Sequence, residues 1–205
     1  MIWGGEHCEA LVIDPGDEPD RILAVLESAD LRCAAVLITH GHFDHVGAVA
    51  RLVRGMACPV YISNLEASCL IEPSASTPPG FTVPASVEPD VVLSGGEHLE
   101  LAGLRIRCVA VPGHSPGSLA FVVSEPDDPG GAVCVSGDAI FAGSVGRTDI
   151  PGASWPTLAA SLGRLLAAVG PDMPLLPGHG PETTFRRELA GNPFLDDLRR
   201  TGVPA

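Results

Sequence analysis

Three histidines and an aspartate are crowded into residues 40–45 of this 205-residue chain. These residues, His40, His42, Asp44 and His45, follow an apolar run at 34–38 that predicts a buried strand. Imidazole and carboxylate side chains are common ligands of zinc, iron and manganese. Because alternate residues of an extended segment point to the same side, His40 and His42 can share one metal ion while Asp44 and His45 reach a second. The alternative, a polar loop whose histidines are merely solvated, is disfavoured by this spacing.

Three further candidate ligands each stand just after a predicted strand. They are His114, Asp138 and His179, after the strands predicted at 104–111, 132–136 and 175–176. Open sheets gather ligands at the ends of their strands, so we expect these side chains to lie near the first loop. Taken alone, each is equally compatible with a turn or a surface position. Together the candidates comprise five histidines and two aspartates, enough to hold two metal ions with one aspartate between them.

Strand-like and helix-like segments alternate in the first and last thirds of the chain, and strands dominate the middle. We expect strands at 10–13, 34–38, 59–62, 91–93, 99–101, 104–111, 119–123, 132–136 and 175–176, and helices at 20–29, 47–54, 155–168 and 183–190. This order predicts an α/β fold with helices packed on sheets, and we expect residues 1–205 to form a single domain, because no linker interrupts them. Residues 72–90 are rich in proline and lack a periodic pattern; they form either a lid over the metal site or an ordinary surface loop.

The charge of the chain excludes several classes of partner. Its formal net charge is -13, which argues against nucleic acid and anionic membranes, because both attract basic surfaces. All twelve cationic side chains are arginines, so no mechanism or anion site that needs a lysine is available. The G-x-S-x-G motif of serine hydrolases is also absent, which leaves that chemistry without support.

The cysteines and the N-terminus bear on the cellular compartment. Six cysteines are scattered without a C-x-x-C pair, and Cys33, Cys108 and Cys134 lie in apolar runs where a thiol packs like a small hydrophobic group. Disulfides are not expected, and no signal peptide or membrane-spanning run is visible. We therefore expect a cytoplasmic protein. His7 and His98 lie in polar surroundings and are expected at the surface.

Six short motifs, in the same order along the chain, are similar to those of the metallo-β-lactamase superfamily, and most closely to its glyoxalase II-like branch. They are Thr-His-Gly-His-Phe-Asp-His at 39–45, Pro-Gly-His-Ser-Pro-Gly-Ser at 112–118, Ser-Gly-Asp at 136–138, Gly-Arg-Thr-Asp at 146–149, Pro-Gly-His-Gly-Pro at 177–181 and Asn-Pro-Phe at 192–194. The turn Ile-Asp-Pro-Gly, which contains Asp14, also matches the family. The resemblance spans nearly the whole chain. It implies an αββα sandwich of two mixed β-sheets flanked by helices, with the metal site at one edge.

Carried over by motif, the resemblance implies two divalent metal ions, zinc first, with iron or manganese as alternatives. It assigns one ion to His40, His42 and His114, and the other to Asp44, His45 and His179, with Asp138 bridging. A hydroxide between the ions would attack the carbonyl of a small-molecule thioester, such as a 2-hydroxyacyl thiol, and the thiolate would leave with little help from an acid. Asp44 and Asp138 are the implied catalytic residues: both hold and orient the metals, and Asp44 also hydrogen-bonds the nucleophile.

The chain departs from full-length glyoxalase II where that enzyme binds glutathione. We expect no counterpart of the C-terminal helical domain of that enzyme, because the sequence ends soon after Asn-Pro-Phe. The chain has no lysine and a single tyrosine, Tyr61. The strands that precede the Ile-Asp-Pro-Gly turn in the family are short here. Arg147 stands where the family has its thiol-binding lysine, so it either binds a substrate carboxylate or forms a salt bridge with Asp149. The thiol carrier and the oligomeric state stay open.

Three functions fit these motifs. The first is a binuclear thioester hydrolase of glyoxalase II type. The second is a mononuclear iron persulfide dioxygenase, which shares the His-x-His-x-Asp-His loop and Gly-Arg-Thr-Asp. The third is a non-catalytic metal-binding protein, which is disfavoured because every ligand position is filled. Pro-Gly-His-Gly-Pro and Asn-Pro-Phe favour the hydrolase, and lactonase, lactamase or other ester-hydrolase activity stays open because fold does not fix substrate.

Overall fold

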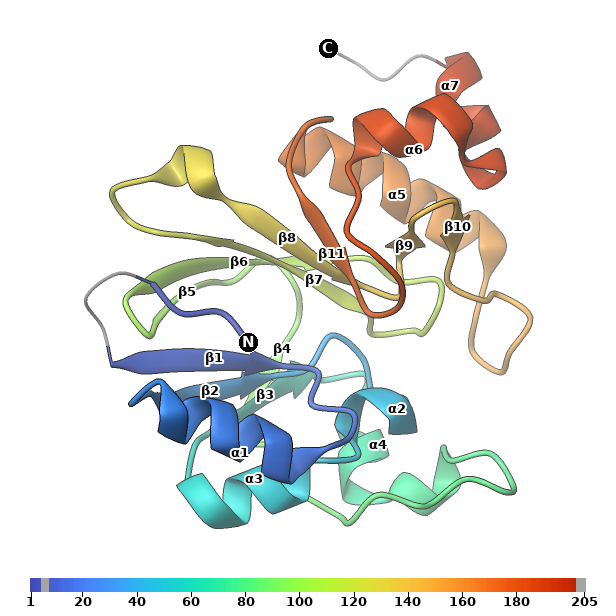
Figure 1. Ribbon diagram of the computed structural model, residues 1–205. Helices are drawn as coiled ribbons and strands as arrows, with labels where there is room; N and C mark the ends of the chain where they lie inside the picture. Colours follow the sequence, from blue (N-terminus) through green and yellow to red (C-terminus); the bar gives the residue numbers. More distant parts are fainter. Residues whose placement is uncertain (5–7, 202–205) are drawn as a thin grey trace.

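Two β-sheets lie face to face, and helices cover the outer side of each sheet (Figure 1). The structure, a computed structural model, describes residues 1–4 and 8–201. Its four layers are the αββα sandwich expected from the sequence. His7, which was expected at the surface, lies outside the described residues.

The first sheet contains four parallel strands in the order β1-β2-β3-β4. They are β1 (Glu9–Ile13), β2 (Arg32–Leu37), β3 (Val60–Ser63) and β4 (Val91–Leu93). An antiparallel bridge between Ile2 and Leu11 adds a short mixed edge beside β1. Parallel neighbours need long crossovers, and these carry α1 (Pro19–Ser28), α2 (Phe43–Val46), α3 (Val49–Met56) and α4 (Ala67–Ile71).

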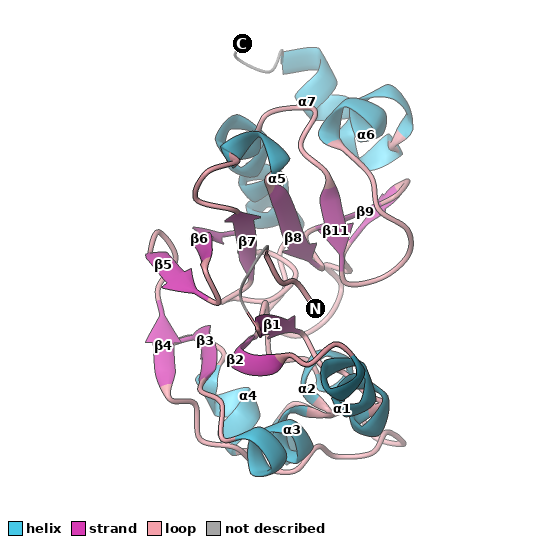
Figure 2. Ribbon diagram, turned by 60° about the vertical axis from the view of Figure 1, so that its left-hand side comes forward, coloured by secondary structure: helices cyan, strands magenta, loops and turns pink. Residues whose placement is uncertain are grey.

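The second sheet is mixed and has the order β11-β8-β7-β6-β5. Its strands are β5 (His98–Leu101), β6 (Leu104–Ala110), β7 (Leu119–Ser124), β8 (Val133–Gly137) and β11 (Leu175–Pro177), of which only β11 and β8 pair in parallel. A separate ribbon joins β9 (Ile140–Phe141) to β10 (Ser144–Val145). Figure 2 shows α5 (Trp155–Val169), α6 (Phe185–Gly191) and α7 (Asp196–Thr201) on the side of this sheet away from the first.

An apolar core fills the space between the two sheets. Leu11 of the first sheet and Ile106 and Phe121 of the second are almost fully buried in it. The central strand β7 is apolar at nearly every position because it is covered on both sides. Phe121 belongs to this core, and Val122 belongs to a second apolar cluster that includes Leu158 of α5. The periodic strand β6 behaves as predicted, with Ile106 inside and its arginines on the outer side.

Sequence patterns located the longer elements, and the differences concern short ones. The helix expected at 47–54 is observed as α3 and begins two residues later, because Gly47 ends the short helix α2 and Ala48 stands at the N-terminus of α3. A Cβ atom on Gly47 would lie 2.2 Å from the Gly16 carbonyl oxygen, so glycine is required there. The helix expected at 183–190 begins later, because Thr183 exchanges two backbone hydrogen bonds with Leu175 (2.8 and 3.1 Å) and Thr184 caps the helix. The pattern did not predict α2, α4, α7, β9 or β10, which are too short to show a period.

Residues 72–90 are largely irregular, as expected, and contain only the short 3-10 helix Pro73–Ala75 before β4. Two more 3-10 turns occur at Pro129–Gly131 and Pro193–Leu195. His98 is exposed on β5, as predicted. Among residues 1–4 and 8–201, no helix has the length and hydropathy that a membrane span requires.

Candidate metal centre

The seven candidate ligands come from four connections that leave strands of both sheets. His40 and His42 follow β2, and Asp44 and His45 lie in α2, the first turn after that loop. The other three follow β6, β8 and β11 and are His114, Asp138 and His179. The fold brings all seven together, although up to 139 positions separate them in sequence (179 − 40).

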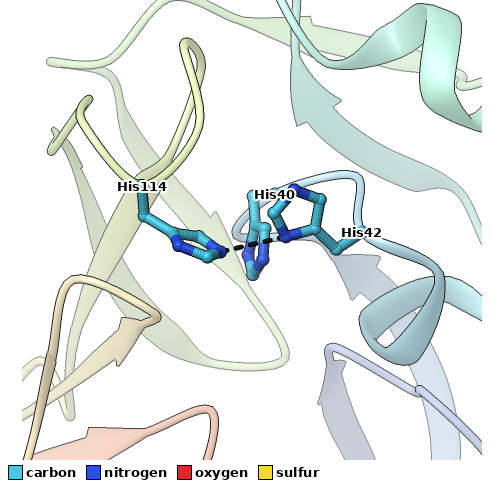
Figure 3. A group of neighbouring side chains, drawn as sticks. All are labelled: His40, His42 and His114. Atoms are coloured by element: carbon cyan, nitrogen blue, oxygen red, sulfur yellow. Dashed lines mark hydrogen bonds between the residues drawn. The ribbon is translucent and has the colours of Figure 1, made fainter. Parts of the chain in front are cut away.

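Three histidine rings converge at one group of candidate ligands (Figure 3). One candidate ligand atom from each of His40, His42 and His114 lies within 4.8 Å of the others. The Nδ1 atom of His42 and the Nε2 atom of His114 are 2.9 Å apart. His40 is 0% exposed and His114 is 4% exposed. We refer to this set as the three-histidine group.

Hydrogen bonds fix which ring nitrogen faces the centre of this group. The hydroxyl of Thr39 donates its only proton to Oδ2 of Asp14 (2.6 Å), so in its 3.0 Å contact with Nδ1 of His40 the imidazole N–H is the donor. The lone pair of His40 is therefore on Nε2, a buried atom without a hydrogen-bond partner. Nδ1 of His114 likewise donates to the backbone carbonyl of Arg147 (2.9 Å), which leaves the lone pair on Nε2.

The second group is formed by Asp44, His45 and His179, whose ligand atoms also lie within 4.8 Å of one another. Nε2 of His179 is 3.3 Å from Nε2 of His45 and 3.4 Å from Oδ2 of Asp44. The Nδ1 proton of His45 is donated to Oδ2 of Asp14 (2.9 Å), so its Nε2 lone pair points into the group. The side chains of His179 and Asp44 are 51% and 41% exposed, so this group opens to solvent. We refer to it as the mixed group.

Asp138 stands between the two groups. Its Oδ1 atom lies 3.3 Å from Nε2 of His45, and its Oδ2 atom lies 3.5 Å from Nε2 of His114 and 3.6 Å from Nε2 of His179. Oδ1 is buried and makes no hydrogen bond, since 3.3 Å from His45 is an approach without hydrogen-bond geometry. A Cβ atom on Gly178 would lie 2.3 Å from this oxygen, so only glycine allows the backbone to pass so close.

The electrostatics of these side chains favour a bound cation. Burial, and then the neighbouring histidines, lower the pKa of His40 well below its usual value, and burial lowers that of His42, so both rings are neutral at pH 7. Burial also lowers the pKa of His45, but Asp138 and Asp14 outweigh it and raise that pKa to about 10. Without an ion, Nε2 of His45 therefore carries a proton at pH 7, and a metal ion that binds there displaces it and takes the lone pair. Burial raises the pKa of Asp138, but His45 lowers it overall. The carboxylates therefore attract positive charge to this point.

The donors fit divalent metal ions. They are imidazole nitrogens and carboxylate oxygens, the combination that zinc, iron and manganese accept. Among residues 1–4 and 8–201, two buried side-chain atoms lack a hydrogen-bond partner, and both of them, Nε2 of His40 and Oδ1 of Asp138, belong to this cluster. Buried polar atoms are nearly always paired in folded proteins, and a metal ion would satisfy both. The supporting contacts of His40, His45 and His114 are those that orient metal-ligating histidines.

A cleft of about 590 Å³ opens over both groups, with His42, His114, Asp44, Asp138 and His179 in its lining. Its walls come from both halves of the sandwich and include Phe43, Ala75, Ser76, Pro78, Phe141, Ile150 and Pro151. Residues 72–90 therefore border the site, and Phe81 of this segment packs its ring on Phe43 at 4.5 Å between centroids. Closure of the segment as a lid stays a prediction.

Arg147 lines the same cleft, and its guanidinium is bound by a neighbour. Nε and Nη2 donate to the two carboxylate oxygens of Asp149 at 2.9 and 3.1 Å. The salt bridge, one of the two roles considered for Arg147, is thus present. A contact between Arg147 and a substrate carboxylate stays a prediction.

Two residues of this site were missed as functional candidates. The sequence indicates Asp14 only as part of a turn, but its carboxylate accepts hydrogen bonds from Thr39 and His45 and so orients both groups. Glu66 carries no sequence signal at all, and it is 3% exposed beside the three-histidine group. The sequence around these two residues does not indicate their roles, because the residues they contact lie 25 or more positions away in the chain.

Comparisons with known proteins find relatives of this chain in sequence and in fold. A model of the metallo-beta-lactamase superfamily matches residues 3–186. Hydroxyacylglutathione hydrolase GloC of Haemophilus influenzae is 35% identical over 199 residues, which cover 96% of this chain and 91% of that protein. The crystal structure of TTHA1623 in a di-iron-bound form has a TM-score of 0.75 and 43% identity, covering 89% of this chain and 88% of its own. BLEG-1 B3 metallo-beta-lactamase has a TM-score of 0.85 and 31% identity, covering 95% and 92%.

Proposed function

The chain belongs to the metallo-beta-lactamase superfamily, and we propose that it is a binuclear metallohydrolase of glyoxalase II type that cleaves a thioester. The observation that carries this proposal is the position of the Asp138 carboxylate. Its Oδ1 atom faces His45 of the mixed group, and its Oδ2 atom faces both His114 of the three-histidine group and His179 of the mixed group. One carboxylate between two sets of nitrogen and oxygen donors is suited to a pair of ions. We propose as ligands His40, His42 and His114 for one ion, and Asp44, His45 and His179 for the other, with Asp138 shared.

The proposed substrate is a 2-hydroxyacyl group bonded to a small thiol. Support comes from the hydroxyacylglutathione hydrolase that is 35% identical over 96% of this chain. The cleft volume of about 590 Å³ suits a small molecule. A thiolate leaves readily, so the reaction does not require a general acid at sulfur.

The side chains of the site divide the remaining work. Divalent ions, when bound, supply a Lewis acid that polarises the thioester carbonyl and lowers the pKa of water. Asp138 sets the spacing of the two groups, and Asp14 keeps the lone pair of His45 directed into the site. The partly exposed carboxylate of Asp44 accepts a proton or hydrogen bond from the attacking water. Phe43, Phe141 and Ile150 line the cleft and exclude bulk solvent from the bound acyl group.

The donor set accepts zinc, iron or manganese. Zinc is the first expectation from the resemblance, and the di-iron-bound form of TTHA1623, at 43% identity, supports iron as a second. The cytoplasmic location expected from the sequence stays a prediction.

The test combines metal content with turnover. Protein purified without chelator should contain about two divalent ions per chain and should release a free thiol from a lactoyl thioester. His42→Ala should abolish turnover, while His98→Ala, which removes an exposed histidine on β5, should keep it. Asp138→Ala should lose both ions, because its carboxylate faces both groups. Full turnover by His42→Ala or Asp138→Ala would refute the site.

Two results would redirect the proposal. A single iron per chain, with oxygen consumed on a thiol-bound persulfide and no thioester cleavage, would identify the dioxygenase instead. Metal binding without hydrolysis of any thioester, lactone or lactam would leave the non-catalytic metal-binding role.

A further inference from the structure

A buried carboxylate, that of Glu66, lies between the two loops that carry the three-histidine group. Its Oε2 atom accepts a hydrogen bond from the backbone N–H of Gly41 (3.1 Å), and its Oε1 atom accepts one from that of Gly117 (2.7 Å). Glu66 itself is 3% exposed and precedes α4. We propose that Glu66 is a positioning residue that holds the two loops at the separation the three-histidine group needs to bind its metal ion. This inference rests on the proposed function, because it assumes an ion at that group.

The two N–H groups are close neighbours of the ligands in the chain. Gly41 separates His40 from His42, and Gly117 follows His114 by three positions. The first loop leaves the first sheet and the second loop belongs to the second sheet, so the group is assembled across the sandwich. A carboxylate that accepts a backbone N–H at each oxygen joins these halves beside the ligand atoms, and such bonds to a charged acceptor are the stronger kind. The thiol of Cys69 also donates to Oε2, at 3.9 Å.

Close packing makes this link rigid. A Cβ atom on Gly41 would lie 2.4 Å from Cβ of Cys69, one turn after Glu66. A Cβ atom on Gly117 would lie 2.6 Å from Oγ of Ser63 and 2.7 Å from Cγ of Glu66. Both loops therefore lie against the segment 63–69 at distances that only glycine permits, and the carboxylate determines how they are spaced.

The contacts of Glu66 distinguish its role from that of an acid or base. It lines the cleft, but both oxygens are engaged by backbone N–H groups. A separate backbone hydrogen bond, from the N–H of Leu119 to the carbonyl of Thr39 (2.8 Å), also joins the two loops. A change confined to the carboxylate therefore leaves the sandwich connected, and its effect should appear at the metal site.

Glu66→Gln is the sharpest test, because the side chain keeps its size but presents only one acceptor, so its NH₂ group must face one of the two N–H groups. Glu72→Gln, at the exposed end of α4, makes the same chemical change away from the loops and serves as the matched control. Zinc is titrated into each chelator-treated protein against a chromophoric chelator. His114→Ala and His179→Ala identify which binding step belongs to which group.

We expect Glu66→Gln to weaken zinc binding about 10- to 100-fold at the step that His114→Ala removes, and to change the other step by less than about threefold. Thermal unfolding in chelator should stay within about 3 °C of the Glu72→Gln control. Equal zinc binding in Glu66→Gln and Glu72→Gln would overturn the inference. Equal weakening of both zinc-binding steps in Glu66→Gln, together with a lower melting temperature, would also overturn it, because that result indicates a merely structural role. If the wild-type chain binds no metal, the proposed function fails and this inference fails with it. Normal metal binding without thioester cleavage refutes the proposed function alone.

Discussion

The carboxylate of Asp14 offers the most direct test of how the fold prepares the metal centre. Oδ1 accepts the backbone N–H of Thr39 (2.7 Å), and Oδ2 accepts both the Thr39 hydroxyl (2.6 Å) and the Nδ1 proton of His45 (2.9 Å). In Asp14→Asn, an amide NH₂ replaces Oδ2 if Oδ1 stays on the Thr39 N–H. His45 then loses its acceptor and turns to the tautomer with the proton on Nε2. In that tautomer the proton occupies the Nε2 lone pair, which would otherwise bind the ion. A wrong tautomer is also the known consequence where an aspartate that orients a histidine is replaced by asparagine.

The size of the effect follows from the hydrogen bond that is lost. A hydrogen bond to a charged group contributes about 1.5–3 kcal/mol, and little solvent screening is expected, because the side chains of His45 and Asp14 are 3% and 10% exposed. Removal of supporting contacts behind metal ligands typically weakens affinity about 10- to 100-fold, which corresponds to about 1.4–2.8 kcal/mol. We expect this loss at the mixed group. The loss at the three-histidine group should be smaller, because His40 is reached only through Thr39.

The assay is zinc content after dialysis against a graded series of chelator concentrations, followed by competition titration. Asp30→Asn is the matched control, because Asp30 is exposed and has a left-handed backbone (φ 52°) like that of Asp14 (φ 47°), a conformation that asparagine also tolerates. Asp14→Asn with two ions bound as tightly as in Asp30→Asn would show that the tautomer argument is wrong. Greater weakening at the three-histidine group than at the mixed group would also contradict it.

Three further outcomes are expected. Asp149→Asn frees the guanidinium of Arg147, so the ratio of kcat/KM for a thioester that bears a carboxylate to kcat/KM for a neutral thioester should rise. Asp172→Asn is the control, because it frees Arg186 from a similarly exposed pair and should not change this ratio. Iodoacetamide at pH 8 should modify the exposed Cys8 long before Cys134, because burial raises the pKa of the Cys134 thiol to about 12 and keeps it protonated. Mass spectrometry of the native protein that finds Cys134 modified first would contradict this prediction. Phe121→Ala should lower the free energy of unfolding in urea by about 3–5 kcal/mol, because the ring is fully buried between the sheets, and a loss below about 1 kcal/mol would show that the core collapses around the gap.

The sequence by itself determined the features that depend only on short segments of the chain. The apolar runs predicted most of the strands, and the positions of His114, Asp138 and His179 just after such runs predicted that they would gather with His40 and His42. Strand ends and loop residues are readable because side-chain alternation and turn composition act over only a few residues. The motif order carried the resemblance to the superfamily for the same reason, since each motif is a short continuous segment.

Only the tertiary structure decided how those ligands are held. Asp14 reaches His45 across 31 positions, and Glu66 reaches Gly41 and Gly117 across 25 and 51 positions. No periodic pattern links such residues, because their contact depends on how two sheets pack and not on local backbone preference. The lone pairs of His40 and His45 are directed by the same distant carboxylate, and the salt bridge of Arg147 with Asp149 likewise required side-chain geometry. The sequence thus predicts which atoms can bind a metal, and the folded chain decides where those atoms point, because orientation is imposed by hydrogen bonds between segments that meet only after folding.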